Sequence, residues 1–243
     1  MHKSGIQFLF KELGKNKYDV PESFTRYLDF IKLYLNRIMY PGSPEIERQL
    51  LRQQDFLVLS ELHPQEIENL KANMNSRSLI PGKKDFCAIQ VNNKNGFDVL
   101  NAVTPPKTKR GAVLIDPSYE ETSDYENVTK SIIQVNKKWS NGIIMLWYPL
   151  LAHRKNEIEN MINSITDAAK KVNQNTEIVN LQLCVNSPDS HKEVSLEEFE
   201  QDKKNPPRLY GSGMLVINSP WHLDEDGEKV IKFLTSFFEQ KNL

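Results

Sequence analysis

The stretch Arg110-Gly111-Ala112-Val113-Leu114-Ile115-Asp116-Pro117-Ser118-Tyr119-Glu120 decides the fold class. Its apolar run, Ala112 to Ile115, ends at Asp116-Pro117, and Tyr119 follows two residues after the proline. A continuous apolar run bounded by a turn signal is typical of a buried parallel strand. In open α/β sheets the ligand binds outside the carboxyl ends of the strands, where Asp116 and Tyr119 would project. The stretch therefore predicts a strand with a ligand site at its end.

The residues after this strand suit the recognition of a base that carries an amino group. A carboxylate and a backbone carbonyl accept hydrogen bonds from an exocyclic amino group, and an aromatic ring stacks on the purine. Asp116-Pro117-Ser118-Tyr119 resembles the Asp/Asn-Pro-Pro-Tyr/Phe signature of S-adenosylmethionine-dependent amino-methyltransferases. A strand followed by a proline turn with a surface tyrosine accounts for the same four residues equally well, because short motifs also arise by chance.

Strands and helices alternate along the rest of the chain. Apolar residues at helical spacing predict helices in the first forty residues, and short apolar runs separated by amphipathic segments predict βαβ units. We therefore expect a three-layer α/β domain with one mostly parallel sheet that contains both the 56–59 and the 112–115 strands. The predicted strands are 56–59, 86–91, 112–115, 142–147, 178–185 and 214–218, and the later predicted helices are 124–139, 156–172 and 224–239. The polar segment 187–210 is predicted to be a loop.

Composition describes an ordinary soluble protein. The chain has 243 residues, 26% charged residues and a formal net charge of -1, so any nucleic-acid footprint must be local. Cys87 and Cys184 lie in apolar segments and are expected to be buried free thiols of a reducing compartment. We expect a cytoplasmic protein, because no apolar run approaches the ~20 residues of a membrane span and the N-terminus lacks a signal-peptide core.

Two further positions suit a nucleotide. Glu61 follows the 56–59 strand, where nucleotide-binding α/β folds place an acid that accepts hydrogen bonds from ribose hydroxyls. A helix N-cap or a surface charge explains Glu61 as well. Asn95-Gly96 precedes an apolar helix and brings backbone close to an adenine ring, or forms a plain turn.

Taken together, these motifs resemble the 23S ribosomal RNA adenine-N6 methyltransferase J family, earlier described as proteins involved in catabolism of external DNA. The resemblance runs from Tyr40 to Trp221, and the order and spacing of many short blocks make it specific. The matching blocks are Tyr40 to Pro44, Leu51 to Asp55, Glu61 to Pro64, Asn95 to Phe97, Arg110-Gly111, Leu114 to Glu120, Asp124-Tyr125, Gly142, Leu146 to Pro149, Ser212 to Met214 and Val216 to Trp221.

The resemblance implies a class I S-adenosylmethionine-dependent methyltransferase with a Rossmann-like three-layer sandwich at 40–243 and a helical segment at 1–39. It implies that Asp116 binds the target amino group and guides its deprotonation, that Pro117 contributes a carbonyl, and that Tyr119 stacks on the flipped adenine. The implied cofactor-binding residues are Ser43, Glu61, Asn95, Gly96 and Asp116. Asn95 stands where the family often has aspartate, and Ser118 replaces the usual second proline.

The chain departs from the family pattern at its amino terminus. Family members begin with a His-rich segment and a first strand that carries a Gly-rich loop near the methionine end of the cofactor, whereas Gly5 and Gly14 here are isolated. In this fold the missing strand lies between the 56–59 and 112–115 strands, so its absence would leave two apolar edges unpaired. Truncation and re-use of the residues before Tyr40 both explain this departure, and we expect weak or absent cofactor affinity in the chain as given.

Parts of the sequence also fit functions other than methyl transfer. A non-catalytic homologue that binds RNA or a partner, or a role in the use of external DNA, is the main alternative, and the basic residues Lys107, Lys109, Arg110, Lys203, Lys204 and Arg208 suit phosphate contacts. The five histidines lack metal-ligand spacing, and Gly211-Ser212-Gly213 lacks the nucleophile-elbow pattern. The expected partner is 23S ribosomal RNA, with no metal, no membrane and a monomeric state.

Overall fold

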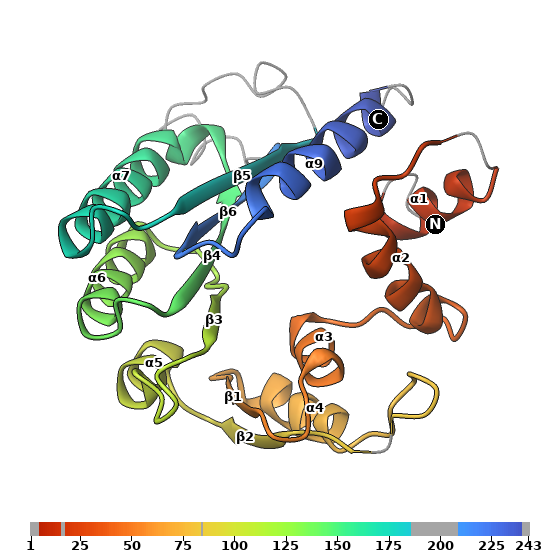
Figure 1. The fold of residues 1–243 in the computed structure, drawn as a ribbon, viewed down its shortest axis with the longest axis horizontal. Helices are drawn as coiled ribbons and strands as arrows, with labels where there is room; N and C mark the ends of the chain where they lie inside the picture. Colours follow the sequence, from red (N-terminus) through yellow and green to blue (C-terminus); the bar gives the residue numbers. More distant parts are fainter. Residues whose placement is uncertain (1–4, 16–17, 84, 186–208, 240–243) are drawn as a thin grey trace, which may run out of the picture. The chain divides into compact units, whose positions relative to one another are not determined.

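The computed structural model describes residues 5–15, 18–83, 85–185 and 209–239. Two compact units divide the chain, one from Gly5 to Val103 and the other from Thr104 onward (Figure 1). The two helices of the predicted 1–39 segment belong to the first unit. A separate helical subdomain over 1–39 stays a prediction.

The first unit is mainly helical. In α2, Phe24, Leu28, Ile31 and Tyr34 recur every three or four residues, and all four are buried. This spacing places them on one helix face, which explains why the 21–35 sequence folds as an amphipathic helix. The elements of this unit are α1 (Ile6–Leu13), α2 (Glu22–Leu35), α3 (Ser43–Leu50), β1 (Phe56–Ser60), α4 (Pro64–Met74), β2 (Ala88–Asn92) and α5 (Gly96–Val103).

Strands β1 and β2 form a parallel two-stranded sheet in which Phe56 pairs with Ala88 and Ser60 with Asn92. Alternate β1 residues, Leu57 and Leu59, are buried. They form a small apolar core that also contains Met74, Cys87, Leu51, Leu70, Ile89 and Val91. This core holds β1 and β2 in register and so brings their carboxyl ends to one edge.

The second unit is a layered α/β structure. Helix α7 contacts β4 and β6, α6 packs along α7, and α9 packs on β5 (Figure 1). Only glycine fits at positions 213 and 227 of this unit without a shift of its neighbours. A Cβ at Gly213 would lie 2.0 Å from the Tyr148 ring, and one at Gly227 would lie 2.5 Å from Leu181. The elements are β3 (Ala112–Ile115), α6 (Thr122–Lys138), β4 (Ile143–Leu150), η1 (Ala152–Arg154), α7 (Lys155–Val172), β5 (Ile178–Cys184), β6 (Gly211–Ile217) and α9 (Leu223–Glu239).

The predicted sheet needs correction. The four strands of the second unit have the order β3-β4-β6-β5, and β1 and β2 form a separate sheet. The 56–59 and 112–115 strands therefore do not share one sheet, since no described strand pairs with the second edge of β1 or of β3. The sheet is also less parallel than predicted: β3 runs parallel to β4, but β6 is antiparallel to both β4 and β5.

Two smaller expectations have mixed outcomes. Cys87 is a buried free thiol, as predicted, whereas Cys184 is an exposed one. Cys184 ends β5, which lies at the edge of its sheet, so its side chain faces solvent. The predicted 187–210 loop lies almost wholly outside the described residues. In the described part of the chain, no helix is long and apolar enough to cross a membrane.

Candidate functional site

The carboxyl end of β3 presents Asp116 and Pro117. Strand β3 ends at Ile115, so Asp116 is the first residue beyond it. The Asp116 residue is exposed and Pro117 is half-buried. Neighbouring atoms nevertheless remove enough water to raise the pKa of the Asp116 carboxyl above its ordinary value. No described residue forms a salt bridge with Asp116, so its carboxylate is an available hydrogen-bond acceptor.

Tyr119 is packed into the protein beside this carboxylate. Only 6% of its surface is exposed, and its hydroxyl donates to the Trp147 carbonyl at 3.0 Å. Its ring lies 4.8 Å from the Tyr125 ring and 6.3 Å from the Trp147 ring. The backbone at Tyr119 has φ 53, in the left-handed region that non-glycine residues seldom adopt. The turn after β3 is therefore held by an aromatic cluster of Tyr119, Tyr125 and Trp147.

A second polar edge lies where β1 and β2 end. The Glu61 backbone nitrogen donates to the Asn92 carbonyl at 3.0 Å, and the Ser60 hydroxyl donates to the Lys94 carbonyl at 2.7 Å. These two bonds tie the end of β1 to the loop that leads to Asn95. Glu61 and Asn95-Gly96 are consequently brought to the same edge of one parallel sheet.

The turns at this edge fix the Glu61 and Asn95 side chains. One Glu61 carboxylate oxygen accepts from the His63 backbone nitrogen at 2.8 Å. The Asn95 side-chain oxygen accepts from the Phe97 backbone nitrogen at 2.9 Å, as α5 begins. No described residue hydrogen-bonds the second Glu61 oxygen or the Asn95 amide nitrogen; Glu61 is half-buried and Asn95 is exposed. They supply one acceptor and one donor for a polar ligand.

Ser43 begins α3 in the same unit. It is exposed, and no described residue hydrogen-bonds its hydroxyl. Gly42 precedes it as an extended N-cap and Pro44 follows in the first turn, so the backbone changes from extended to helical at Ser43. The Ser43 hydroxyl is thus presented at a helix start that carries no side-chain cap.

The predicted residues thus fall into two sets. Ser43, Glu61, Asn95 and Gly96 lie in the first unit, and Asp116, Pro117 and Tyr119 lie in the second. The structure brings together Glu61 with Asn95-Gly96, and Asp116 with Pro117 and Tyr119. Sequence reasoning had matched Tyr125 and Trp147 to the family without giving them a role; their contacts with Tyr119 supply one. No group of histidine, cysteine, aspartate and glutamate among the described residues is arranged to hold a metal ion.

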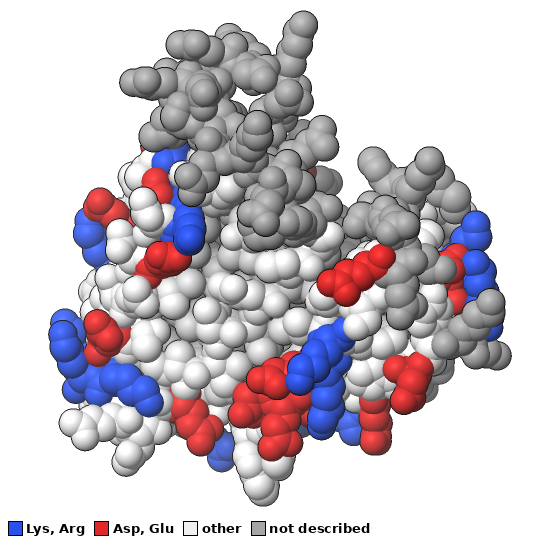
Figure 2. All heavy atoms as spheres, turned by 90° about the horizontal axis from the view of Figure 1, so that it is seen from above, with Lys and Arg blue, Asp and Glu red and all other residues white. Residues whose placement is uncertain are grey.

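Acidic and basic side chains are both present on the surface of the protein. On the face drawn in Figure 2, acidic and basic side chains both occur in small groups, and neither sign covers the face. Lys107, Lys109 and Arg110, just before β3, are exposed, whereas Lys203, Lys204 and Arg208 lie outside the described residues. Attraction to a polyanion must therefore come from a few local cations.

The layered α/β unit, with its acid-proline turn at the carboxyl end of a parallel strand, is consistent with the class I methyltransferase fold that the family and structure matches show. The chain also aligns with a crystal structure of a Legionella pneumophila str. Philadelphia 1 protein of the DUF519 family. That alignment has a TM-score of 0.71 at 26% identity and covers 97% of this chain and 76% of that one.

The family model described as "Ribosomal RNA large subunit methyltransferase D, RlmJ" matches residues 3–242, and the chain belongs to this family. It is 34% identical to ribosomal RNA large subunit methyltransferase J of Escherichia coli K12 over 222 residues, which cover 90% of this chain and 68% of that protein. It is 32% identical to the protein of the same name from Haemophilus influenzae Rd over 238 residues, which cover 96% of this chain and 72% of that protein.

Proposed function

We propose that this protein transfers a methyl group from S-adenosylmethionine to the N6 amino group of an adenine in 23S ribosomal RNA, in the cytoplasm and as a monomer. The observation that carries the proposal is Asp116-Pro117 at the carboxyl end of the parallel strand β3. The family match over residues 3–242 supports ribosomal RNA as the substrate class.

Asp116 is the central residue of the proposed reaction. The lone pair of an adenine amino group is delocalised into the ring, which makes the nitrogen a poor nucleophile. The Asp116 carboxylate and the Pro117 carbonyl accept hydrogen bonds from its two N–H groups and favour a more tetrahedral nitrogen. When the nitrogen takes the methyl group, one of these protons leaves to the Asp116 carboxylate or to water. The remaining contribution is the alignment of that nitrogen with the methyl group, which a turn fixed at a strand end provides.

Glu61, Asn95-Gly96 and Ser43 fit the proposed cofactor by the chemistry of their free groups. The Glu61 oxygen that His63 does not engage accepts from a ribose hydroxyl, and Asn95 offers a donor beside the Gly96 backbone. The Ser43 hydroxyl suits the polar methionine portion. S-adenosylmethionine, when bound, supplies an electrophilic methyl group on a positively charged sulfur.

Tyr119 has two roles in the proposal. Stacking on a flipped adenine compensates for the stacking lost from the RNA helix, a contribution of about 1–3 kcal/mol per base. In the present structure the Tyr119 hydroxyl is bonded to Trp147 and its ring contacts Tyr125, so the ring is held beside Asp116 by these partners. Stacking on a substrate requires the ring face toward Asp116 to become accessible.

Methylation of 23S ribosomal RNA isolated from cells that lack this modification tests the proposal. We expect N6-methyladenine in the digested RNA, detected by mass spectrometry, and none with a DNA substrate of the same sequence. Methylation of the DNA alone would overturn the RNA assignment. RNA binding without methylation or cofactor binding would favour the non-catalytic homologue.

Calorimetry with S-adenosylhomocysteine tests the cofactor separately. Residues 1–39 hold no Gly-rich loop of the kind that the family resemblance places at the methionine end of the cofactor, so we expect weak binding by these 243 residues. Preparation of a second protein that includes residues encoded upstream is the matched comparison. Equal, tight binding by both forms would show that the loop contributes little.

A further inference from the structure

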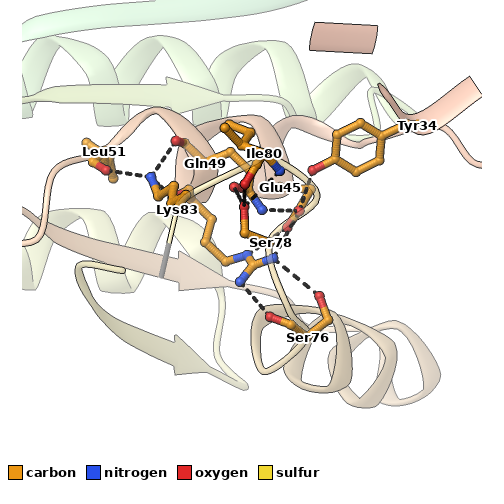
Figure 3. Close-up of polar contacts among 9 residues, drawn as sticks. Tyr34, Glu45, Gln49, Leu51, Ser76, Ser78, Ile80 and Lys83 are labelled. Carbon is orange, nitrogen blue, oxygen red and sulfur yellow. Dashed lines mark hydrogen bonds and ion pairs between the residues drawn. The ribbon is translucent and has the colours of Figure 1, made fainter. Parts of the chain in front are cut away.

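The segment that presents Ser43 is connected to a buried polar network behind α3. Arg48 has no exposed surface, although it is charged. Its guanidinium Nε donates to Glu45 Oε2 at 2.7 Å, and its Nη2 donates to Glu45 Oε1 at 3.0 Å (Figure 3). A buried arginine is tolerated only when such partners satisfy its donors, so Glu45 and Arg48 are fixed to one another.

Glu45 lies in the first turn of α3, two residues after Ser43. Its carboxylate also accepts from the Tyr34 hydroxyl at 2.6 Å and from the Gln49 amide at 2.8 Å. Burial acts to raise the pKa of Glu45, but the hydrogen bonds from Arg48, Tyr34 and Gln49 outweigh it and hold that pKa below its ordinary value. The first turn of α3 therefore carries an ionised carboxylate whose charge is balanced by Arg48 and whose position is fixed by its hydrogen bonds.

The same network reaches two other segments. Arg48 Nη1 donates to the Ser76 carbonyl at 2.9 Å, just after α4, and the Arg48 guanidinium lies 4.1 Å from the centre of the Phe86 ring. Tyr34 comes from α2 (Figure 3). Through Glu45, the α3 start is thus anchored to α2, to the end of α4 and to the segment before β2.

We propose that Tyr34 and Arg48 are positioning residues for the cofactor site, acting through Glu45 to hold the Gly42-Ser43 backbone in place. This inference rests on the proposed role of Ser43. Neither residue touches the ligand. The first-turn amides of Glu45 and Ile46, which both donate to the Gly42 carbonyl at 3.1 Å, report directly on whether that turn is held.

The test uses Tyr34→Phe, which removes one hydroxyl and keeps the ring that lies 5.1 Å from Phe30. Lys83→Met is the matched control, because Lys83 binds carbonyls at the other end of α3 and leaves the Glu45 bonds intact. We measure the hydrogen exchange of the Glu45 and Ile46 amides and the calorimetric affinity for S-adenosylhomocysteine. Arg48→Lys, which keeps the charge but not the planar fork, is the second variant.

We expect Tyr34→Phe to raise exchange in the first turn of α3 about threefold to tenfold and to weaken S-adenosylhomocysteine binding by a similar factor. Arg48→Lys has the larger effect of the two. In a Ser43→Ala background, Tyr34→Phe has no further effect on affinity, because the residue through which it acts is gone. Lys83→Met lowers the melting temperature without changing the affinity.

Two results would overturn the inference: unchanged exchange of the Glu45 and Ile46 amides in both variants, or an equal loss of affinity with and without the Ser43 hydroxyl. Equal loss of affinity in Lys83→Met would also overturn it, since a general loosening of α3 would then suffice. If the unaltered chain binds too little S-adenosylhomocysteine to measure, as its lack of a Gly-rich loop permits, the affinity comparison gives no result. The exchange measurement then decides alone whether the network holds the turn.

Discussion

The two strand-end regions of this protein are built in different ways. At the β1-β2 edge, Glu61 and Asn95 are fixed by short backbone hydrogen bonds and keep polar groups that no described residue bonds. At the end of β3, Tyr119 is buried against Tyr125 and Trp147, and Asp116 presents an exposed carboxylate. The first edge is thus prepared for a polar, flexible ligand. In the proposed reaction the second receives a flat ring whose amino group meets the Asp116 carboxylate and the Pro117 carbonyl.

The largest effect should come from removing the charge at β3. Asp116→Ala is expected to lower methyl transfer about 10²–10⁴-fold, because the acceptor of the amino protons is lost. Affinity for S-adenosylhomocysteine should change little, as measured by calorimetry. Glu126→Gln, which removes an exposed acid paired with Lys130, is the control and should retain activity. Unchanged adenine methylation in Asp116→Ala would remove the proposed mechanism.

Glu61→Ala should produce the reverse pattern at the other edge. The loss of a charged hydrogen bond to a ribose hydroxyl weakens cofactor affinity about 10–100-fold, with a smaller change in kcat. Steady-state kinetics with varied S-adenosylmethionine separate the two effects. Glu68→Gln, which alters an exposed pair with Lys71, serves as the comparison. A fall in kcat alone would indicate that Glu61 acts in the methyl-transfer step, and would contradict the assignment of cofactor binding to this edge.

Two substitutions of Tyr119 separate the contribution of its ring from that of its hydroxyl group. Tyr119→Ala removes the stacking surface and should raise the KM for RNA more than tenfold. Tyr119→Phe removes only the hydroxyl, which donates to the Trp147 carbonyl and contacts the Met161 sulfur at 3.8 Å and stabilises the turn by about 1 kcal/mol. The Phe variant should bind RNA normally and melt slightly earlier. Equal loss of RNA binding in both variants would show that the hydroxyl holds the ring in its productive place.

The smallest expected effect concerns pH. The folded-state pKa of Asp116 is raised above its ordinary value of 3.8, so protonation favours the folded state. As pH rises from 3.8 through that raised value, ionisation of Asp116 destabilises the fold, while methyl transfer gains its acceptor. Asp116→Asn should therefore melt slightly later than the unaltered protein above this window and equally below it. Identical melting temperatures at all pH values would remove the burial argument for Asp116.

Several parts of the fold follow directly from the sequence. The apolar run 112–115 predicts β3 to the residue, and the spacing of Phe24, Leu28 and Ile31 predicts α2. The direction of β6 does not follow, because side-chain alternation is the same in parallel and antiparallel strands. The separation of β1 from β3 contradicts the prediction of one shared sheet, because no described strand pairs with both of them.

The candidate site was only partly accessible to the same reasoning. Asp116 and Glu61 can be found because each polar residue follows an apolar run, but their roles come from the family resemblance. The burial of Tyr119 has no local signal, since it depends on Trp147 in another strand. The same holds for the burial of Arg48, which depends on contacts with Ser76 and Phe86 far along the chain.

Lys83 has a consequence for chemical labelling. Its ammonium group donates to the carbonyls of Arg48, Gln49 and Leu51, so each of its three N–H bonds has a backbone acceptor. An amine reagent must reach this nitrogen, which the three backbone bonds hold against the end of α3 until that end opens. Lys83 should therefore be acylated far more slowly than exposed Lys130. Its rate of modification would then report how often the end of α3 frays.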